Sequence, residues 1–136
     1  MTSSRFLKGF FTALVLYIIG DVVWHNVLFY DFYSARLMAI NGTPLSTDFP
    51  PFIIAFEIIG AAVTAYFILA AQKTSTVQEG AVHGGMLGLS MVAAINFVAH
   101  SLIPKWDVTL VAVDTLWGIL LGVIAGAAVV LVTKRK

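Results

Sequence analysis

The sequence has no cysteine and few charged residues. Without cysteine, disulfides, thiolate metal sites, iron–sulfur clusters and cysteine nucleophiles are excluded. Charged residues are 11% and hydrophobic residues 60% of the chain, whereas globular proteins have about a quarter and about a half. A soluble fold of 136 residues cannot bury so much apolar surface. The composition and the mean hydropathy of +0.94 therefore predict an integral membrane protein.

Several functional signatures are also missing. The chain has no HExxH zinc motif, no nucleophile elbow, no glycine-rich phosphate loop and no dinucleotide-binding fingerprint. No connecting segment is long enough to fold as a soluble catalytic domain. The net charge of +1 gives no indication of a nucleic-acid partner. The lipid bilayer is the partner that the composition predicts.

Four stretches are long and apolar enough to cross a bilayer. A spanning helix needs about 20 mostly apolar residues, because about 30 Å of hydrocarbon is crossed at about 1.5 Å per residue. The expected helices cover about residues 6–30, 52–71, 81–103 and 109–132. We predict an all-α fold, in which residues 1–136 form a single transmembrane domain with four transmembrane helices in an antiparallel bundle.

The links between these stretches contain helix-capping residues. Thr47 or Asp48 can cap the second helix, and Asp107 the fourth. Thr76 and Glu79 have the spacing of a capping box at the start of the third helix. Because the link before this box is short, we expect the second and third helices to form a tight antiparallel hairpin.

The basic residues lie mostly on one side of this arrangement. The positive-inside rule then places both termini in the cytoplasm, with the protein in the cell membrane. On the outer side, residues 31–40 have Phe32 and Tyr33 on one face and suit a short interfacial helix, or alternatively an extended surface loop. Arg36 and Lys105 fall on this outer side. The basic residues on the cytoplasmic side are Arg5, Lys8, Lys73, Lys134, Arg135 and Lys136.

Polar residues occur within the spans at a common depth. Ionisable side chains inside a membrane are costly and usually face the bundle interior, where they have partners. Counted from the outer end of each span, these residues fall within about nine positions, or about 14 Å at helical rise. We therefore expect one polar layer in the outer half of the membrane. Its members are Asp21, His25, Asn26, Glu57, Asn96, His100 and Asp114.

Glycines and tryptophans accompany this layer. Gly118 and Gly122 lie beneath Asp114 at four-residue spacing, which is typical of close helix packing in membranes. Trp24 and Trp106 fit the aromatic belt at the membrane surface, whereas the belt does not explain the position of Trp117. Its indole N–H offers one explanation, because it can donate a hydrogen bond to a buried carboxyl. We expect a structural role for Trp24, Trp117, Gly118 and Gly122.

Three functions fit the polar layer. The first is binding or transport of a small ligand, cation or proton in a pocket of Asp21, Glu57, His100 and Asp114, with His25 and Asn96 at its edge. The second is a structural role as a homo-oligomer or an accessory subunit of a membrane complex, whose glycine rows pack against other helices. The third is a membrane enzyme or metalloprotein. In it His25, His100 and Glu57 would hold a divalent metal, or histidines would ligate haem.

Two strings go beyond hydropathy. Asp21-x-x-Trp24 is followed by Asp31-Phe32-Tyr33, and Trp106 is followed by Val113-Asp114-x-x-Trp117-Gly118. With these strings the chain resembles an uncharacterised family of small bacterial four-helix membrane proteins, a predicted membrane domain of unknown function. The family has Thr-Asn in place of Ile95-Asn96 and no imidazoles at His25 and His100, which speaks against a family-wide metal site. The resemblance implies the architecture and carries over Asp21, Trp24, Asn96, Asp114 and Trp117.

Overall fold

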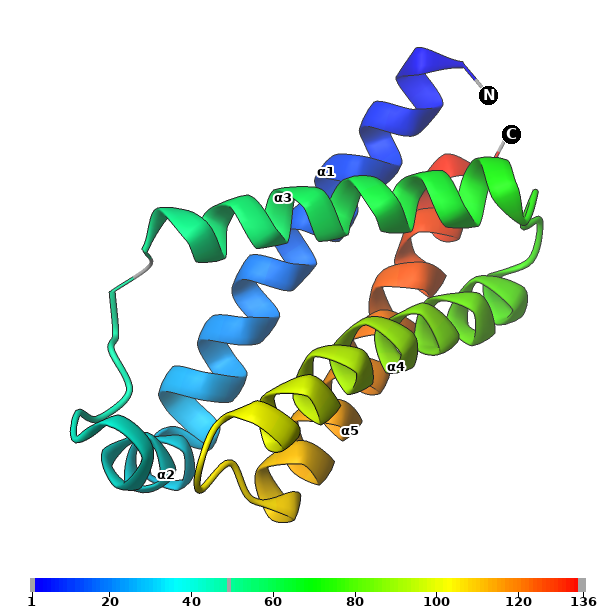
Figure 1. The fold of residues 1–136 in the computed structure, drawn as a ribbon. Helices are drawn as coiled ribbons and strands as arrows, with labels where there is room; N and C mark the ends of the chain where they lie inside the picture. Colours follow the sequence, from blue (N-terminus) through cyan, green and yellow to red (C-terminus); the bar gives the residue numbers. More distant parts are fainter. Residues whose placement is uncertain (1, 49, 135–136) are drawn as a thin grey trace.

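The described part of the protein is helical and contains no strand. The structure, a computed structural model, describes residues 2–48 and 50–134, and gives no placement for the Phe52 side chain. Four of its helical stretches are long and apolar enough to cross a membrane, which confirms the predicted all-α fold (Figure 1). The elements are α1 (Ser3–Asp21), η1 (Val22–Leu28), α2 (Tyr30–Asn41), α3 (Pro51–Tyr66), η2 (Phe67–Ala71), α4 (Val77–Leu102) and α5 (Val108–Thr133).

Local sequence signals determine where most helices begin. The predicted capping box is present, so α4 begins at Val77, four residues before the expected start at 81. Asp107 caps α5, its side chain accepting from the Leu110 N–H at 2.8 Å. The predicted cap of the second helix by Thr47 or Asp48 is wrong. Pro50 is the N-cap instead, because Pro51 at the first helical position already has the backbone angle of a helix and lacks an N–H to satisfy.

The first crossing changes from an α-helix to a π-helix before it ends. In η1 the hydrogen bonds reach back five residues, and the Phe29 N–H still donates to the Trp24 carbonyl at 2.9 Å. Such wide turns are rare and often occur at functional sites. The segment contains Trp24 and His25. After it α2 turns away as a separate helix, where either a short helix or a loop was expected over 31–40, and ends at Gly42 with φ of +78°.

The closest helix pair is α4 with α5, and glycines make this contact possible. Gly80, Gly84 and Gly88 of α4 face glycines of α5. A Cβ atom on Gly84 would lie 2.1 Å from the Gly122 carbonyl oxygen, so the two backbones touch where a side chain would stand. Gly118 and Gly122 therefore contact α4 of the same chain.

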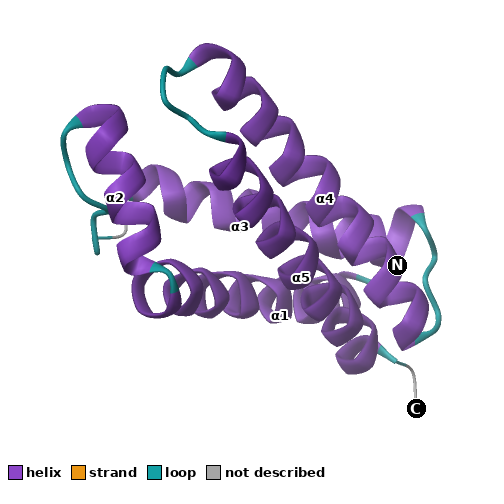
Figure 2. Cartoon of the chain, turned by 90° about the horizontal axis from the view of Figure 1, so that it is seen from below, coloured by secondary structure: helices purple, strands orange, loops and turns teal. Residues whose placement is uncertain are grey.

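The remaining crossings follow in the spatial order α5, α1, α3 (Figures 1 and 2). The expected tight hairpin of the second and third helices is wrong: α3 packs on α1, and only its continuation η2 contacts α4 appreciably. The reason is that each helix uses its small-residue face elsewhere. Gly60 and Thr64 of α3 lie against Tyr17 of α1, while the glycines of α4 face α5. As a result, α3 and α4 diverge from their shared link.

The two ends of the molecule differ in character. Both termini lie at one end with the link between η2 and α4, and α2 lies at the other end with the link between α4 and α5 (Figure 1). Near the terminal end, α1, the α3–η2 helix and α5 enclose an apolar core that includes Ala13, Ala61, Ile68 and Val129. Arg135 and Lys136, which contributed to the predicted orientation, lie outside the described residues.

The glycine contact predicts a difference between two matched variants. Gly84→Ala forces α4 and α5 apart and should lower the free energy of unfolding by about 1–3 kcal/mol. Gly60→Ala should not lower it, because that Cβ would lie 3.4 Å from Tyr17 and alanine is the better helix former. Unfolding in mixed micelles, followed by circular dichroism, measures both values. Equal stability of the two variants would contradict the close contact.

Candidate functional site

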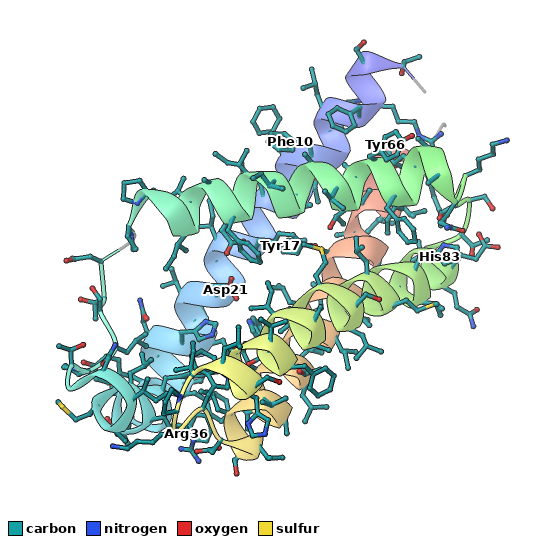
Figure 3. All side chains as sticks on the ribbon, viewed as in Figure 1. Phe10, Tyr17, Asp21, Arg36, Tyr66 and His83 are labelled. Carbon is teal, nitrogen blue, oxygen red and sulfur yellow. The ribbon has the colours of Figure 1, made fainter. Side chains whose placement is uncertain are left out.

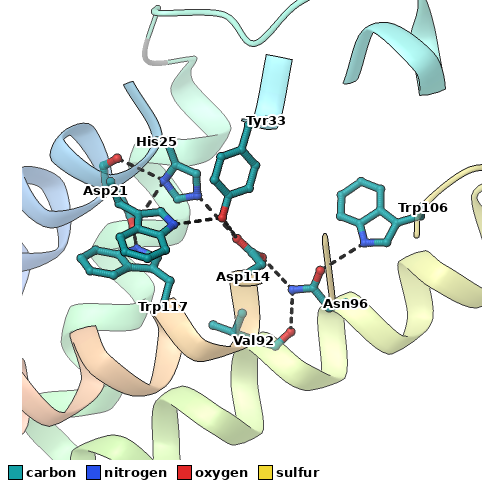
Figure 4. Close-up of polar contacts among 9 residues, drawn as sticks. Asp21, His25, Tyr33, Val92, Asn96, Trp106, Asp114 and Trp117 are labelled. Atoms are coloured by element: carbon teal, nitrogen blue, oxygen red, sulfur yellow. Dashed lines mark hydrogen bonds and ion pairs between the residues drawn. The ribbon is translucent and has the colours of Figure 1, made fainter. Parts of the chain in front are cut away.

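One carboxylate, Asp114 of α5, joins four elements at the end of the molecule opposite the termini. Its Oδ1 accepts a hydrogen bond from the Tyr33 hydroxyl of α2 at 3.1 Å and lies 3.5 Å from Nε2 of His25 in η1 (Figure 4). Its Oδ2 accepts from Nδ2 of Asn96 in α4 at 2.6 Å. Groups that are far apart in the sequence therefore meet at a single side chain.

Asn96 extends this network across α4. It is fully buried, and its Nδ2 donates both to Asp114 and to the Val92 carbonyl, the latter at 3.1 Å. Its Oδ1 accepts from the Trp106 indole N–H at 3.1 Å. Because its hydrogen-bonding groups have partners, this amide is stable at a depth where an unpaired one would be costly.

Asp21 is the second carboxylate of the network. Its Oδ1 accepts from the Trp117 indole N–H at 2.6 Å, the kind of partner the sequence suggested for a buried carboxyl. Trp117 stacks on Trp24 with ring centroids 4.5 Å apart and planes 7° from parallel. Trp24 in turn donates to the Tyr33 hydroxyl at 3.0 Å. The two carboxylates are thus connected through aromatic side chains.

His25 lies between the two carboxylates. Its Nδ1 is 3.1 Å from the Asp21 backbone oxygen and 3.8 Å from Asp21 Oδ1, while its Nε2 faces Asp114. Both ring nitrogens therefore face oxygen acceptors. Only the ring with a proton on each nitrogen donates to both, so the geometry fits a cationic imidazolium held by two anions.

Helix α2 covers the site at the end of the molecule opposite the termini. Tyr33 is buried, and this burial raises the pKa of its hydroxyl; the negative charge of Asp114 raises that pKa further. The hydroxyl consequently stays protonated and donates to Asp114. At the next turn, Arg36 stacks on Phe32 and its Nε lies 3.2 Å from Oδ2 of Asp107, the cap of α5. This ion pair connects α2 to the start of α5.

A cavity of about 310 Å³ lies beside the network, under α2 and the loop that follows it. This volume is at the low end for small-molecule pockets. Asp21, His25, Tyr33 and Asp114 contribute to its wall, together with Trp106 and the loop residue Asp48. The Asp21, His25 and Asp114 side chains are 21%, 26% and 25% exposed, so a ligand in the cavity can reach them.

Two residues of the expected pocket lie elsewhere. His100 is exposed in the last turn of α4, and its Nδ1 interacts with the Trp106 carbonyl at 2.5 Å. Glu57 is buried and borders a second cavity of about 70 Å³, which residues of α1, α3, α4 and α5 line and to which Asp21 also contributes. His25 and Asn96, expected at the edge, are central instead. Whether any of these residues binds a ligand stays a prediction.

The arrangement does not bring the candidate metal ligands together. His25 is in the network, His100 is at the Trp106 carbonyl and Glu57 is in the second cavity. Within residues 2–48 and 50–134 there is no group of three or more His, Asp or Glu side chains that could hold a metal ion. The described side chains instead form hydrogen bonds and ion pairs with one another.

Sequence reasoning missed Tyr33 and Trp106 as partners of the polar layer. Tyr33 was placed on the apolar face of an interfacial segment, and Trp106 in the aromatic belt. Both stand inside the strings that carry the family resemblance, Asp31-Phe32-Tyr33 and the string that begins at Trp106. Those two strings could have indicated this role, because in them Tyr33 and Trp106 stand in the same sequence motif as acidic residues.

The network predicts that one hydroxyl stabilises the fold. Tyr33→Phe removes the donor to Asp114 and the acceptor of Trp24, and should lower the free energy of unfolding by about 1–3 kcal/mol. Tyr66→Phe makes the same chemical change on a side chain that is 58% exposed, and should change stability by less than about 0.5 kcal/mol. Denaturation of both proteins in the same detergent compares them. A loss of similar size in both would rule out a special role for Tyr33.

Comparison with known proteins agrees with this architecture. No curated protein and no solved structure matches the chain. The family model described as predicted membrane protein (DUF2177) matches residues 6–131. This match includes every residue of the network and nearly all of the four crossings. The chain therefore belongs to the DUF2177 family of predicted membrane proteins, whose function is unknown.

Proposed function

We propose that this protein binds a small organic cation in the cavity of about 310 Å³ beneath α2. The observation that carries the proposal is that two carboxylates from different crossings, Asp21 and Asp114, line one cavity and are partly exposed to it. Carboxylates at membrane depth are costly, and a bound cation is one way of compensating that cost.

The charges around the cavity favour a cation. Its walls carry the three acidic side chains of Asp21, Asp48 and Asp114 against the single imidazole of His25. Trp106 and Tyr33 add aromatic rings, which attract organic ammonium groups through their faces. An organic cation fits this wall better than a metal ion, because the described residues contain no cluster that could hold a metal.

A bound cation and a protonated His25 would compete for the same two carboxylates. The imidazole is within 3.8 Å of Asp21 Oδ1 and 3.5 Å of Asp114 Oδ1. When a cation takes these oxygens, the neutral ring becomes the favoured form of His25. Ligand binding should then release a proton.

The proposal is one of binding and does not include passage across the membrane. Between the cavity and the terminal end, the crossings enclose the apolar core formed by Ala13, Ala61, Ile68, Leu69, Val129 and Val130. A cation would have to lose its hydration to pass such a core, which is costly. The described conformation therefore offers a site that opens at one end.

Tetramethylammonium tests the site, because it is a cation without other functional groups. We expect it to change the tryptophan fluorescence of the wild-type protein in lipid nanodiscs, since Trp106 borders the cavity. Asp114→Asn should weaken binding at least about tenfold, which corresponds to about 1.4 kcal/mol. Asp48→Asn should weaken it less, because Asp48 lies in the exposed loop.

Asp31→Asn is the matched control, because it removes the same charge from an exposed position of α2 outside the cavity. It should bind tetramethylammonium as the wild type does. The circular dichroism spectrum of each variant checks that it is folded. Saturable binding that is the same in wild type and in folded Asp114→Asn would refute the proposal, as would the absence of binding to the wild type.

We further propose that the termini face the cytoplasm and the cavity faces the outside. Among the described residues, the terminal end has four basic residues and the other end two, and an excess of basic residues marks the cytoplasmic side. The four are Arg5, Lys8, Lys73 and Lys134, and the two are Arg36 and Lys105. Figure 3 shows Arg36 at the end away from the termini.

The absence of native cysteine allows a direct test of this orientation. Thr47→Cys, in the loop after α2, should react with a membrane-impermeant thiol reagent in intact cells. Ser75→Cys, in the link before α4, should react only after the cells are permeabilised. The opposite labelling pattern would reverse the orientation and leave the cavity on the cytoplasmic side.

A further inference from the structure

We infer that the protein has a further binding site at the terminal end of the bundle, and that this site holds the phosphate group of an anionic phospholipid. The site lies at the opposite end of the molecule from the cavity beneath α2, and its ligand has the opposite charge. The inference is therefore independent of the proposed cation site.

The site is a cavity of about 240 Å³ between the start of α1 and the end of α5. Figure 1 shows these two helix ends at the same end of the molecule. Three basic residues line the cavity, Arg5 and Lys8 of α1 and Lys134, which directly follows α5. A water molecule takes about 30 Å³ in the liquid, so the cavity has room for a phosphate group. Residues that in the sequence only indicated orientation therefore surround one space in the structure.

The described part of the protein does not neutralise the positive charge of this cavity. None of the described residues that line it is acidic. The ion pairs among the described residues do not involve Arg5, Lys8 or Lys134. Glu79, at the start of α4, does not border the cavity, and its carboxylate accepts hydrogen bonds from backbone N–H groups of the preceding link. An anion is the ligand that complements such a wall.

Hydrogen-bond donors at this cavity also favour an anion with several oxygen atoms. The Nε atom of Arg5 is buried, and no described residue accepts a hydrogen bond from it. A buried donor without an acceptor is costly, and phosphate oxygens are acceptors that an arginine side chain binds well. The first turn of α1 adds the positive end of a helix dipole, since Ser4 in this turn lines the cavity and the turn contains no acidic residue.

The position of the cavity favours a lipid headgroup over a free anion. It lies at the ends of two helices that are long and apolar enough to cross a membrane, which is the level of the headgroups. Leu7 on α1 and Val132 on α5 are 49% and 45% exposed, and in a membrane such side chains contact acyl chains. A phospholipid beside them brings its phosphate to the basic side chains without leaving the bilayer. Basic pockets between spanning helices bind such headgroups in other membrane proteins.

The same three basic residues select the net charge of the headgroup. A zwitterionic headgroup carries an ammonium group, which Arg5, Lys8 and Lys134 would repel. An anionic headgroup such as that of phosphatidylglycerol has a phosphate and no ammonium. The inferred ligand is therefore a phospholipid with a net negative charge.

Native mass spectrometry of the full chain in detergent tests this site, because it counts the bound lipids and measures their affinity. The probes are phosphatidylglycerol, phosphatidylcholine and inorganic phosphate. Arg5→Gln and Lys8→Gln each remove one charge from the cavity wall. Lys73→Gln is the matched control, because it removes the same charge as Lys8→Gln from an exposed position in the link before α4, at the same end of the molecule but outside the cavity. Circular dichroism checks that each variant is folded.

We expect the wild type to bind one phosphatidylglycerol saturably, and to bind phosphatidylcholine more weakly. Arg5→Gln and Lys8→Gln should each weaken the binding of phosphatidylglycerol at least about fivefold, whereas Lys73→Gln should bind it as the wild type does. An equal loss in Lys8→Gln and Lys73→Gln would show diffuse attraction to a positive surface and would overturn the site. Displacement of the lipid by inorganic phosphate at equal concentration would overturn the lipid as its ligand. If the wild type binds no phosphatidylglycerol, the inference fails and the proposed cation site is unaffected.

Discussion

The architecture depends on the Asp114 carboxylate, which is partly buried at the end of the molecule opposite the termini. A charge at this depth requires partners, and its partners come from η1, α2 and α4. Each partner in turn fixes a neighbour: Tyr33 holds Trp24, and Asn96 holds Trp106. Satisfying one carboxylate therefore determines how the first crossing, α2 and the hairpin of α4 and α5 meet. The cavity exists because these groups surround Asp114 without filling all the space beneath α2.

Two kinds of contact divide the molecule between them. Glycines bring α4 and α5 together backbone to backbone, and this contact needs no polar group in the membrane. Hydrogen bonds and stacked rings connect α1, η1 and α2 to that pair at the opposite end from the termini. Because α3 takes part in neither glycine packing with α4 nor the network around Asp114, it can diverge from α4. The close packing of α4 with α5 and the divergence of α3 thus have a common origin in where the small residues lie.

Much of the fold could be predicted from the sequence, because each crossing is mostly apolar and helix-capping residues stand at the starts of α4 and α5. The common depth of Asp21, His25, Asn96 and Asp114 could also be counted along the chain. The π-helical turn could not be, since no proline or glycine within Val22–Leu28 marks it. The divergence of α3 from α4 could not be predicted either. A row of glycines indicates that another helix packs closely, but it does not identify that helix.

The long sequence separations within the network bear on how the protein is made. Asp21 and Trp117 are 96 residues apart, and His25 and Asp114 are 89 residues apart. During synthesis at about 5–20 residues per second, the first crossing therefore emerges seconds before its partners exist. Until the final helix is inserted, its carboxylate and imidazole must be shielded by water at the bilayer surface or by the insertion machinery. A chain that stops before α5 therefore lacks Trp117 and Asp114, the partners of this carboxylate and this imidazole.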